Sequence, residues 1–167
     1  NNRVVPTKGF VAVLKATFSN NFTQEYFFQT YMMKLQGFVP LGNKFSVSIK
    51  AGGTTVAGIS SLPASARVYE HAVIGGPESL RGYRMERFWG NTSFYNNNEL
   101  RFITNIRSRF FAAKAGLLAF FDDGRVWTKN DPSSLLHTSY GGGILLAPFS
   151  QLSFTLTYGI TPETRMI

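Results

Sequence analysis

Hydrophobic and polar residues alternate along most of this chain, with the two-residue period of a β-strand whose faces meet different surroundings. In one such segment, Phe10, Leu14 and Phe18 fall on one face, and Lys15 and Thr17 fall on the other. The alternation predicts strands in seven segments, which are Phe10 to Phe18, Tyr26 to Gln36, Phe45 to Ala51, Glu99 to Arg107, Phe111 to Phe121, His137 to Leu146 and Leu152 to Tyr158. The chain is therefore predicted to be all-β and antiparallel.

The basic residues of these segments share one face of the predicted sheet. When the more apolar face of every strand is assigned to the outside, the inward face carries Lys15, Lys34, Lys50, Arg101, Arg107 and Lys114. No strand requires a lysine or an arginine in the middle of its apolar face. An apolar outer face and a polar inner face are typical of a transmembrane β-barrel, which has lipid outside and water inside.

Short and long connections alternate between the predicted strands. The short turns are Val39 to Asn43, Ser108 to Phe110 and Ala147 to Gln151. The long loops are Ser19 to Glu25, Gly58 to Asn91 and Asp122 to His137. Short turns on one rim and long loops on the other indicate an outer-membrane barrel, whose short turns face the periplasm. A soluble antiparallel sandwich, with its apolar faces packed together, is the alternative interpretation.

The composition favours the barrel. Hydrophobic residues make up 44% of the 167 residues and aromatic residues 15%, whereas charged residues make up 16%, below the roughly 25% of soluble domains. A run of about 18 apolar residues is absent from the sequence, which excludes a transmembrane helix and leaves the barrel as the way to span a bilayer. The first ten residues lack the pattern of a signal peptide, so we expect the chain to begin inside a mature protein. Although the net charge is +8, the basic residues lie on the inward face, and we expect no nucleic-acid partner.

The sequence offers little for catalysis or metal binding. Cysteine is absent, and His71 and His137 are isolated, without a histidine at metal-ligand spacing. The stretch "DDGRVWTKND" lacks the spacing of a calcium loop, and Gly141 to Gly143 precede a strand instead of a phosphate-binding helix. We therefore predict no catalytic residue, no metal, no cofactor and no enzymatic activity in this chain.

One stretch, "GGPESLRGY" (Gly75 to Tyr83), resembles the loop motif of the bacterial surface antigen barrels. This superfamily of outer-membrane protein insertases includes BamA, TamA and the two-partner secretion transporters. Further stretches resemble the same family in the same order, namely "PTKG" (Pro6 to Gly9), "NNELRF" (Asn97 to Phe102), "FFDDGRVW" (Phe120 to Trp127) and "GGGILLAPFSQLSFTLTYG" (Gly141 to Gly159). Leu80 stands where many relatives carry valine, and Tyr83 where many carry phenylalanine.

The resemblance implies a sixteen-stranded barrel, of which residues 1–167 would form the carboxy-terminal portion with about seven strands, the last strand being missing. Residues 58–92 would be a long loop folded into the lumen. The family role is to assemble or translocate proteins at the bacterial outer membrane. Implied partners are outer-membrane lipid and lipopolysaccharide, an unfolded β-barrel substrate or secreted polypeptide, and periplasmic domains or accessory lipoproteins. Two alternatives stay open: a barrel that secretes or displays a fused amino-terminal domain, and a soluble β-rich binding protein.

Within that loop, the residue types suggest how it would be anchored. A guanidinium away from bulk water needs carboxylate partners, and Glu99 and Asp122 lie on the inward faces of the two strands that follow Arg81. The remaining motif residues are Gly75 and Gly76, expected at positive φ, Leu80, Gly82, expected to allow close backbone approach, and Tyr83, expected to combine an apolar body with a hydroxyl.

Overall fold

The computed structural model describes residues 5–21, 26–58, 71–107, 112–128, 135–148, 152–163 and 165–166. Across these residues the regular structure is all strand, which confirms the predicted fold class. The described part of the chain contains no helix long and apolar enough to cross a membrane.

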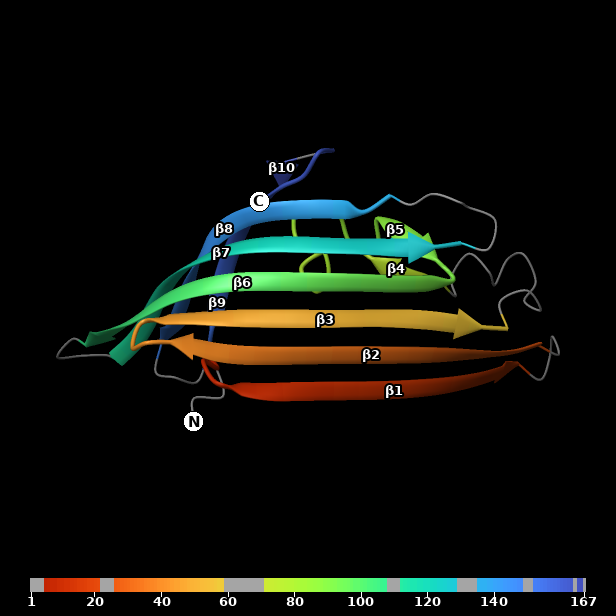
Figure 1. The fold of residues 1–167 in the computed structure, drawn as a ribbon, viewed down its shortest axis with the longest axis horizontal. Helices are drawn as coiled ribbons and strands as arrows, with labels where there is room; N and C mark the ends of the chain where they lie inside the picture. The colour runs from red at the N-terminus through yellow and green to blue at the C-terminus, as the bar shows by residue number, and fades with distance from the viewer. Residues whose placement is uncertain are drawn as a thin grey trace.

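Seven long strands and one short strand form a single antiparallel sheet (Figure 1). They are β1 (Gly9–Asn21), β2 (Tyr26–Leu41), β3 (Phe45–Ala57), β6 (Thr92–Arg107), β7 (Ala112–Trp127), β8 (His137–Pro148), β9 (Phe154–Ile160) and the two-residue β10 (Arg165–Met166). The strands follow one another across the sheet in chain order, as in an up-and-down barrel. β1 and β10 are the two edges, so the described strands form an open, curled wall, in agreement with the predicted barrel fragment.

Side-chain exposure in this wall is the reverse of that in a soluble sheet. Large apolar side chains stand exposed on the outer face, among them Phe10 (68%) and Leu14 (77%). Small polar side chains are buried on the inner face, among them Ser46 (2%) and Ser48 (4%). Since a soluble sandwich would cover its apolar face, this pattern favours a barrel with lipid outside over the sandwich.

Cross-strand register joins the inward residues of all the strands into one surface. Ser48 of β3 pairs with Glu99 of β6, and Glu99 pairs in turn with Phe120 of β7. The same register places on this inner face all the basic residues assigned to it from the sequence, which are Lys15, Lys34, Lys50, Arg101, Arg107 and Lys114. The faces read from the alternation therefore agree with the register.

The predicted long loop at 58–91 contains a second, smaller sheet. β4 (Ala72–Ile74) and β5 (Phe88–Gly90) pair antiparallel within it. Each strand is only three residues long, too short for a period of two to be recognised in the sequence. We call residues 71–91 the inner loop.

The predicted start of β6 and the predicted end of β7 were wrong. β6 begins at Thr92, seven residues before the predicted start, and β7 continues to Trp127, beyond the predicted end at Phe121. The additional residues are paired throughout, and on the outer face Asn96 Nδ2 donates a hydrogen bond to Asp123 Oδ1 at 3.1 Å. Because polar residues occupy both faces there, the alternation that marks the rest of these strands is lost. The predicted turn at 108–110 lies outside the described residues.

Candidate functional site

The inner loop lies against the inner face of β6 and β7 (Figure 1). Its apolar side consists of Ile74, Leu80 and Tyr83, which are buried together against Tyr95 and Val126 of the wall. Ile74 and Leu80 are no more than 1% exposed. Since burying one such side chain contributes about 1.5–3 kcal/mol, this cluster fixes the loop to the wall.

Two glycines turn the chain at the start of the motif. Gly75 has φ 126° and Gly76 has φ 86°, as expected from the sequence, and side chains other than glycine rarely adopt such values. Ser79 closes the turn, because its Oγ accepts a hydrogen bond from the Gly75 N–H at 2.8 Å. Asn97 of β6 then donates through Nδ2 to the Ser79 carbonyl at 2.6 Å, which ties the turn to the wall.

Arg81 is the centre of the site, and its partners are the two expected carboxylates. Its Nε donates to Asp122 Oδ2 at 2.8 Å and its Nη2 to Asp122 Oδ1 at 2.7 Å, in the two-pronged geometry that suits a guanidinium. The main-chain N–H of Arg81 donates to the same Oδ2 at 3.0 Å. The third prong, Nη1, donates to Glu99 Oε2. Asp122 is fully buried, so its charge depends on these donors.

A second arginine completes the ionic cluster. Arg101 lies two residues after Glu99 on the same face of β6, and its Nε donates to Glu99 Oε1. Glu99 therefore bridges two guanidinium groups, and Arg81 bridges two carboxylates. The two positive and two negative charges balance, which reduces the cost of burying them.

The electrostatic state of Arg81 follows from this arrangement. Burial disfavours its charged form, but hydrogen bonds and attraction from Asp122 and Glu99 together outweigh that effect and raise the pKa of Arg81 above its usual value. The guanidinium also lies over the ring of Phe120, 3.9 Å from the centroid. Phe120 in turn fills the space left by Gly141, its cross-strand neighbour, where a Cβ would come within 2.7 Å of the ring.

Gly82 brings the loop backbone against β9. It has φ 93°, and a Cβ on Gly159 would come within 2.6 Å of the Gly82 Cα. Neither position has room for a larger residue without movement of the main chain. The close approach expected at Gly82 is thus made to a second glycine.

Tyr83 and Arg87 extend the contacts of the inner loop to β8 and to the turn that follows β9. The Tyr83 hydroxyl donates to the Thr138 carbonyl of β8 at 3.1 Å, and burial raises the pKa of Tyr83. Arg87 Nε lies 3.2 Å from Glu163 Oε2, in the turn that follows β9. Lys50 of β3 donates to the Glu78 carbonyl at 2.6 Å. Together with the contacts to β6, β7 and β9 described above, these contacts connect the inner loop to five strands, which are β3, β6, β7, β8 and β9.

The predicted basic residues divide into two groups. Lys50 and Arg101 belong to the loop site, as described above. The other four share the inner face away from the loop, on β1, β2 and the far ends of β6 and β7; they are Lys15, Lys34, Arg107 and Lys114. Among the described residues, histidines and carboxylates nowhere gather in a group of three that could hold a metal.

Several contributors to the site were not recognised in the sequence. Arg101 was assigned only to the inner face, although its position two residues after Glu99 was a usable signal. Phe120, Asn97 and Gly159 had no signal of their own, because their roles depend on contacts with residues of the inner loop.

The wall and the loop define the class of protein: an antiparallel barrel wall with an apolar outer face and a motif-bearing loop held against its inner face. The model of one family, described as the Omp85 superfamily domain, matches residues 1–165. The chain therefore belongs to the Omp85 superfamily. Comparison with curated proteins and with solved structures gave no match.

Proposed function

We propose that this chain is part of a bacterial outer-membrane barrel that assembles other proteins into that membrane or translocates them across it. Membership in the Omp85 superfamily supports this general role, and the exposed apolar outer face supports the location. The substrate would be an unfolded β-barrel protein or a secreted polypeptide. By resemblance to the family, the seam between the first and last strands would open, so that its backbone groups pair with an incoming strand.

The observation that carries the proposal is the ionic anchor of the inner loop, Arg81 on Asp122 and Glu99. It braces β6 and β7 from the inside, and the neighbouring contacts of the loop extend the brace to β3, β8 and β9. Bending this part of the wall would separate buried charges, which is costly. If the inner loop holds β3 and β6 to β9 together, the barrel would open more readily between its other strands. A mechanism that opens a single seam requires this difference between the two parts of the barrel.

The test uses the full-length protein in phosphatidylcholine liposomes, with a urea-denatured outer-membrane barrel as substrate. Insertion is measured as protease protection and as altered gel mobility of unheated substrate. We expect the wild type to insert substrate faster than protein-free liposomes do, and Arg81→Ala to lose most of that gain. Arg84→Ala is the matched control, because Arg84 is an exposed arginine of the same loop.

Insertion at the rate of protein-free liposomes would contradict a role in assembly. In that case, protease accessibility of an attached amino-terminal domain on intact cells would favour the alternative, a barrel that secretes or displays a fused domain.

A further inference from the structure

The segment before β1 carries the stretch "PTKG", and its path departs from that of the strand. Gly9, the first residue of β1, pairs with Phe38 of β2, close to the short turn at residues 42–44. Its φ of 138° is a value that other residues rarely adopt, and in Figure 1 the chain before it turns aside from the line of β1. Gly9 therefore changes the direction of the chain, and we call residues 5–8 the strap.

Val5, the first residue of the strap, is buried against strands that are not neighbours of β1. It is 2% exposed and packs with Leu145 and Ala147 of β8, and Ile103 of β6 joins the same cluster. By register these three residues lie on the inner face, near the short-turn ends of their strands. Val5 therefore occupies an apolar cleft inside the lumen, at the rim of the short turns.

The strap reaches this cleft by crossing the lumen and not by following the wall. β8 is five places from β1 in the sheet, which corresponds to roughly 24 Å along the wall at about 4.8 Å per strand. Val5 lies four residues before Gly9, and four extended residues span at most about 14 Å. The contact with β8 forms because the wall curls and the strap takes the shorter path across its inside.

Two further features hold the strap in this path. Pro6 fixes its own φ and favours an extended conformation at Val5, the residue before it. The Pro6 carbonyl accepts a long hydrogen bond, of 3.5 Å, from Nη1 of Arg101. Since Arg101 also donates to Glu99, the strap and the inner loop are attached to the same ionic cluster.

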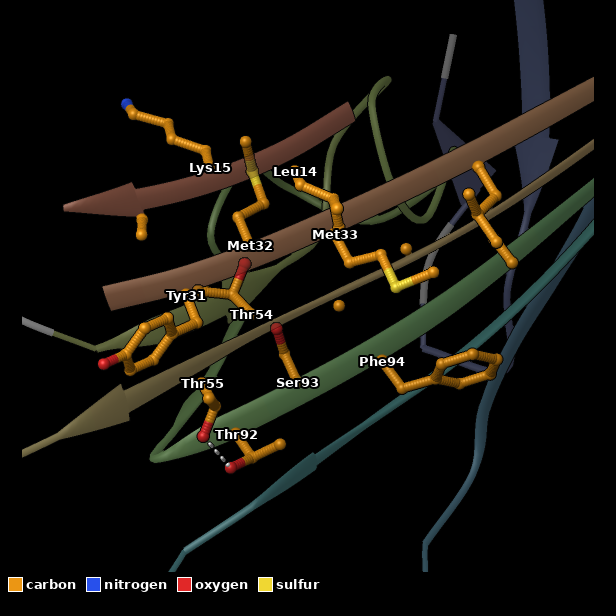
Figure 2. A pocket seen from close by; sticks show the side chains of 15 residues that line it. Leu14, Lys15, Tyr31, Met32, Met33, Thr54, Thr55, Thr92, Ser93 and Phe94 are labelled. Carbon is orange, nitrogen blue, oxygen red and sulfur yellow. Dashed lines mark hydrogen bonds between the residues drawn. The ribbon is translucent and has the colours of Figure 1, made fainter. Parts of the chain in front are cut away.

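The outer face offers more apolar surface nearby, but the strap does not use it. Phe10, the second residue of β1, is 68% exposed on that face. The apolar hollow beside Leu14 and Met33, on the same face, is left open by the described chain (Figure 2). A segment that needed only apolar cover would find it there by a shorter path, so the inward position of Val5 reflects a specific contact in the lumen.

We propose that the strap is an autoinhibitory gate, which closes the lumen at the rim of the short turns and swings out about Gly9 when the lumen opens. The proposal rests on the outer-membrane barrel proposed above, in which this rim faces the periplasm. A segment that crosses the lumen obstructs a polypeptide or a hydrated ion that enters from that side. One buried side chain and one long hydrogen bond hold the strap, and an entering polypeptide with an apolar side chain can replace both contacts.

The first test measures how well the strap covers the cleft. Leu145→Cys is introduced into the full-length protein in a background without other cysteines, and its reaction with a water-soluble maleimide is followed in phosphatidylcholine nanodiscs. We expect slow labelling with the native strap. Val5→Asp should speed the labelling at least about tenfold, because a carboxylate without a partner is not stable in an apolar cleft. Thr7→Asp is the matched control, because Thr7 is an exposed residue of the same strap; it should leave the labelling slow.

The second test asks whether the strap closes the lumen. In planar phosphatidylcholine bilayers, Val5→Asp should increase the open fraction of the single-channel current severalfold over the wild type, whereas Thr7→Asp should not. If Val5→Asp fails to fold, Val5→Ser should change labelling and current in the same direction.

Equal labelling rates for Val5→Asp and Thr7→Asp, or faster labelling without a change in current, would overturn the gate. The insertion assay described above is a separate readout. Substrate insertion together with equal labelling rates would overturn the gate alone. Lack of insertion together with faster labelling and increased current would contradict the assembly role alone.

Discussion

Replacing Arg81 by alanine should be the most damaging single change in the inner loop. The substitution removes the two side-chain donors to Asp122, the donor to Glu99 and the stacking on Phe120. Removing one partner of a buried ion pair costs about 3–5 kcal/mol. Asp122 would keep the main-chain N–H of residue 81, and Glu99 would keep Arg101, so we expect about 3 kcal/mol, the lower end of that range.

A double-mutant cycle separates this interaction from its surroundings. Asp122→Asn removes the fully buried charge but leaves Arg81 paired with Glu99, so we expect a loss of about 2 kcal/mol. Arg81→Ala alone leaves the buried carboxylate of Asp122 without its arginine, and the double mutant Arg81→Ala/Asp122→Asn no longer contains that carboxylate. The double mutant should therefore lose less than the sum of the single losses, by about 1–2 kcal/mol. Arg81→Lys should restore little, because an ammonium cannot donate to two oxygens of Asp122 and to Glu99 in the same plane.

The assay is equilibrium unfolding of the full-length protein by urea in detergent micelles, combined with protease sensitivity of the inner loop. Loop cleavage should increase in Arg81→Ala before the strands unfold, because the loop loses its anchor first. Losses that add within about 0.5 kcal/mol would show that Arg81 and Asp122 do not interact, and would refute this account of the anchor.

Three further predictions concern the wall and the loop contacts. Val47→Arg, on the outer face two residues from the start of β3, should lower the membrane yield, by an energy between the roughly 2–4 kcal/mol of the bilayer midplane and the about 0–1 kcal/mol of the interface, whereas Ser48→Arg on the inner face should keep most of the yield; equal yields would refute the assigned faces. Gly159→Ala should destabilise the protein by about 1–3 kcal/mol, because the new Cβ meets the Gly82 main chain, and an unchanged melting temperature would contradict that packing. Tyr83→Phe should lose about 1 kcal/mol in urea unfolding, the value of its hydrogen bond to β8, and a larger loss would assign another role to the hydroxyl.

The faces of the strands could be predicted from the sequence because lipid and lumen impose opposite polarities on neighbouring residues. Val47 and Ser48 illustrate the rule: the alternation alone assigns their sides, and the register agrees. The rule fails for Thr92 to Asn98, where polar residues occupy both faces of β6. It also fails for β4 and β5, which are shorter than two periods of the pattern.

The ionic partners of Arg81 were accessible from the sequence for a similar reason. The two-residue alternation along each strand places Glu99 and Asp122 on the inner face, and a buried guanidinium needs carboxylate partners. The alternation does not reveal that Phe120 lies beneath the guanidinium of Arg81 or that Gly159 faces Gly82. Those contacts depend on the register between strands and on the path of the loop, which turn residues and long-range pairing determine together.

The inner loop also supplies a core that the wall lacks. At Gly124 of β7, a Cβ would come within 3.2 Å of Ile74 and 3.3 Å of Leu80, so side chains of the loop occupy the space that a side chain of the strand would fill. Ser93, on the same stretch of inner wall, is buried and small. Because these strands present glycine and small polar residues inward, much of their apolar packing comes from the loop. Release of the loop and loosening of β6 to β8 should therefore occur together, which argues against any mechanism in which the loop leaves its site while this part of the wall stays rigid.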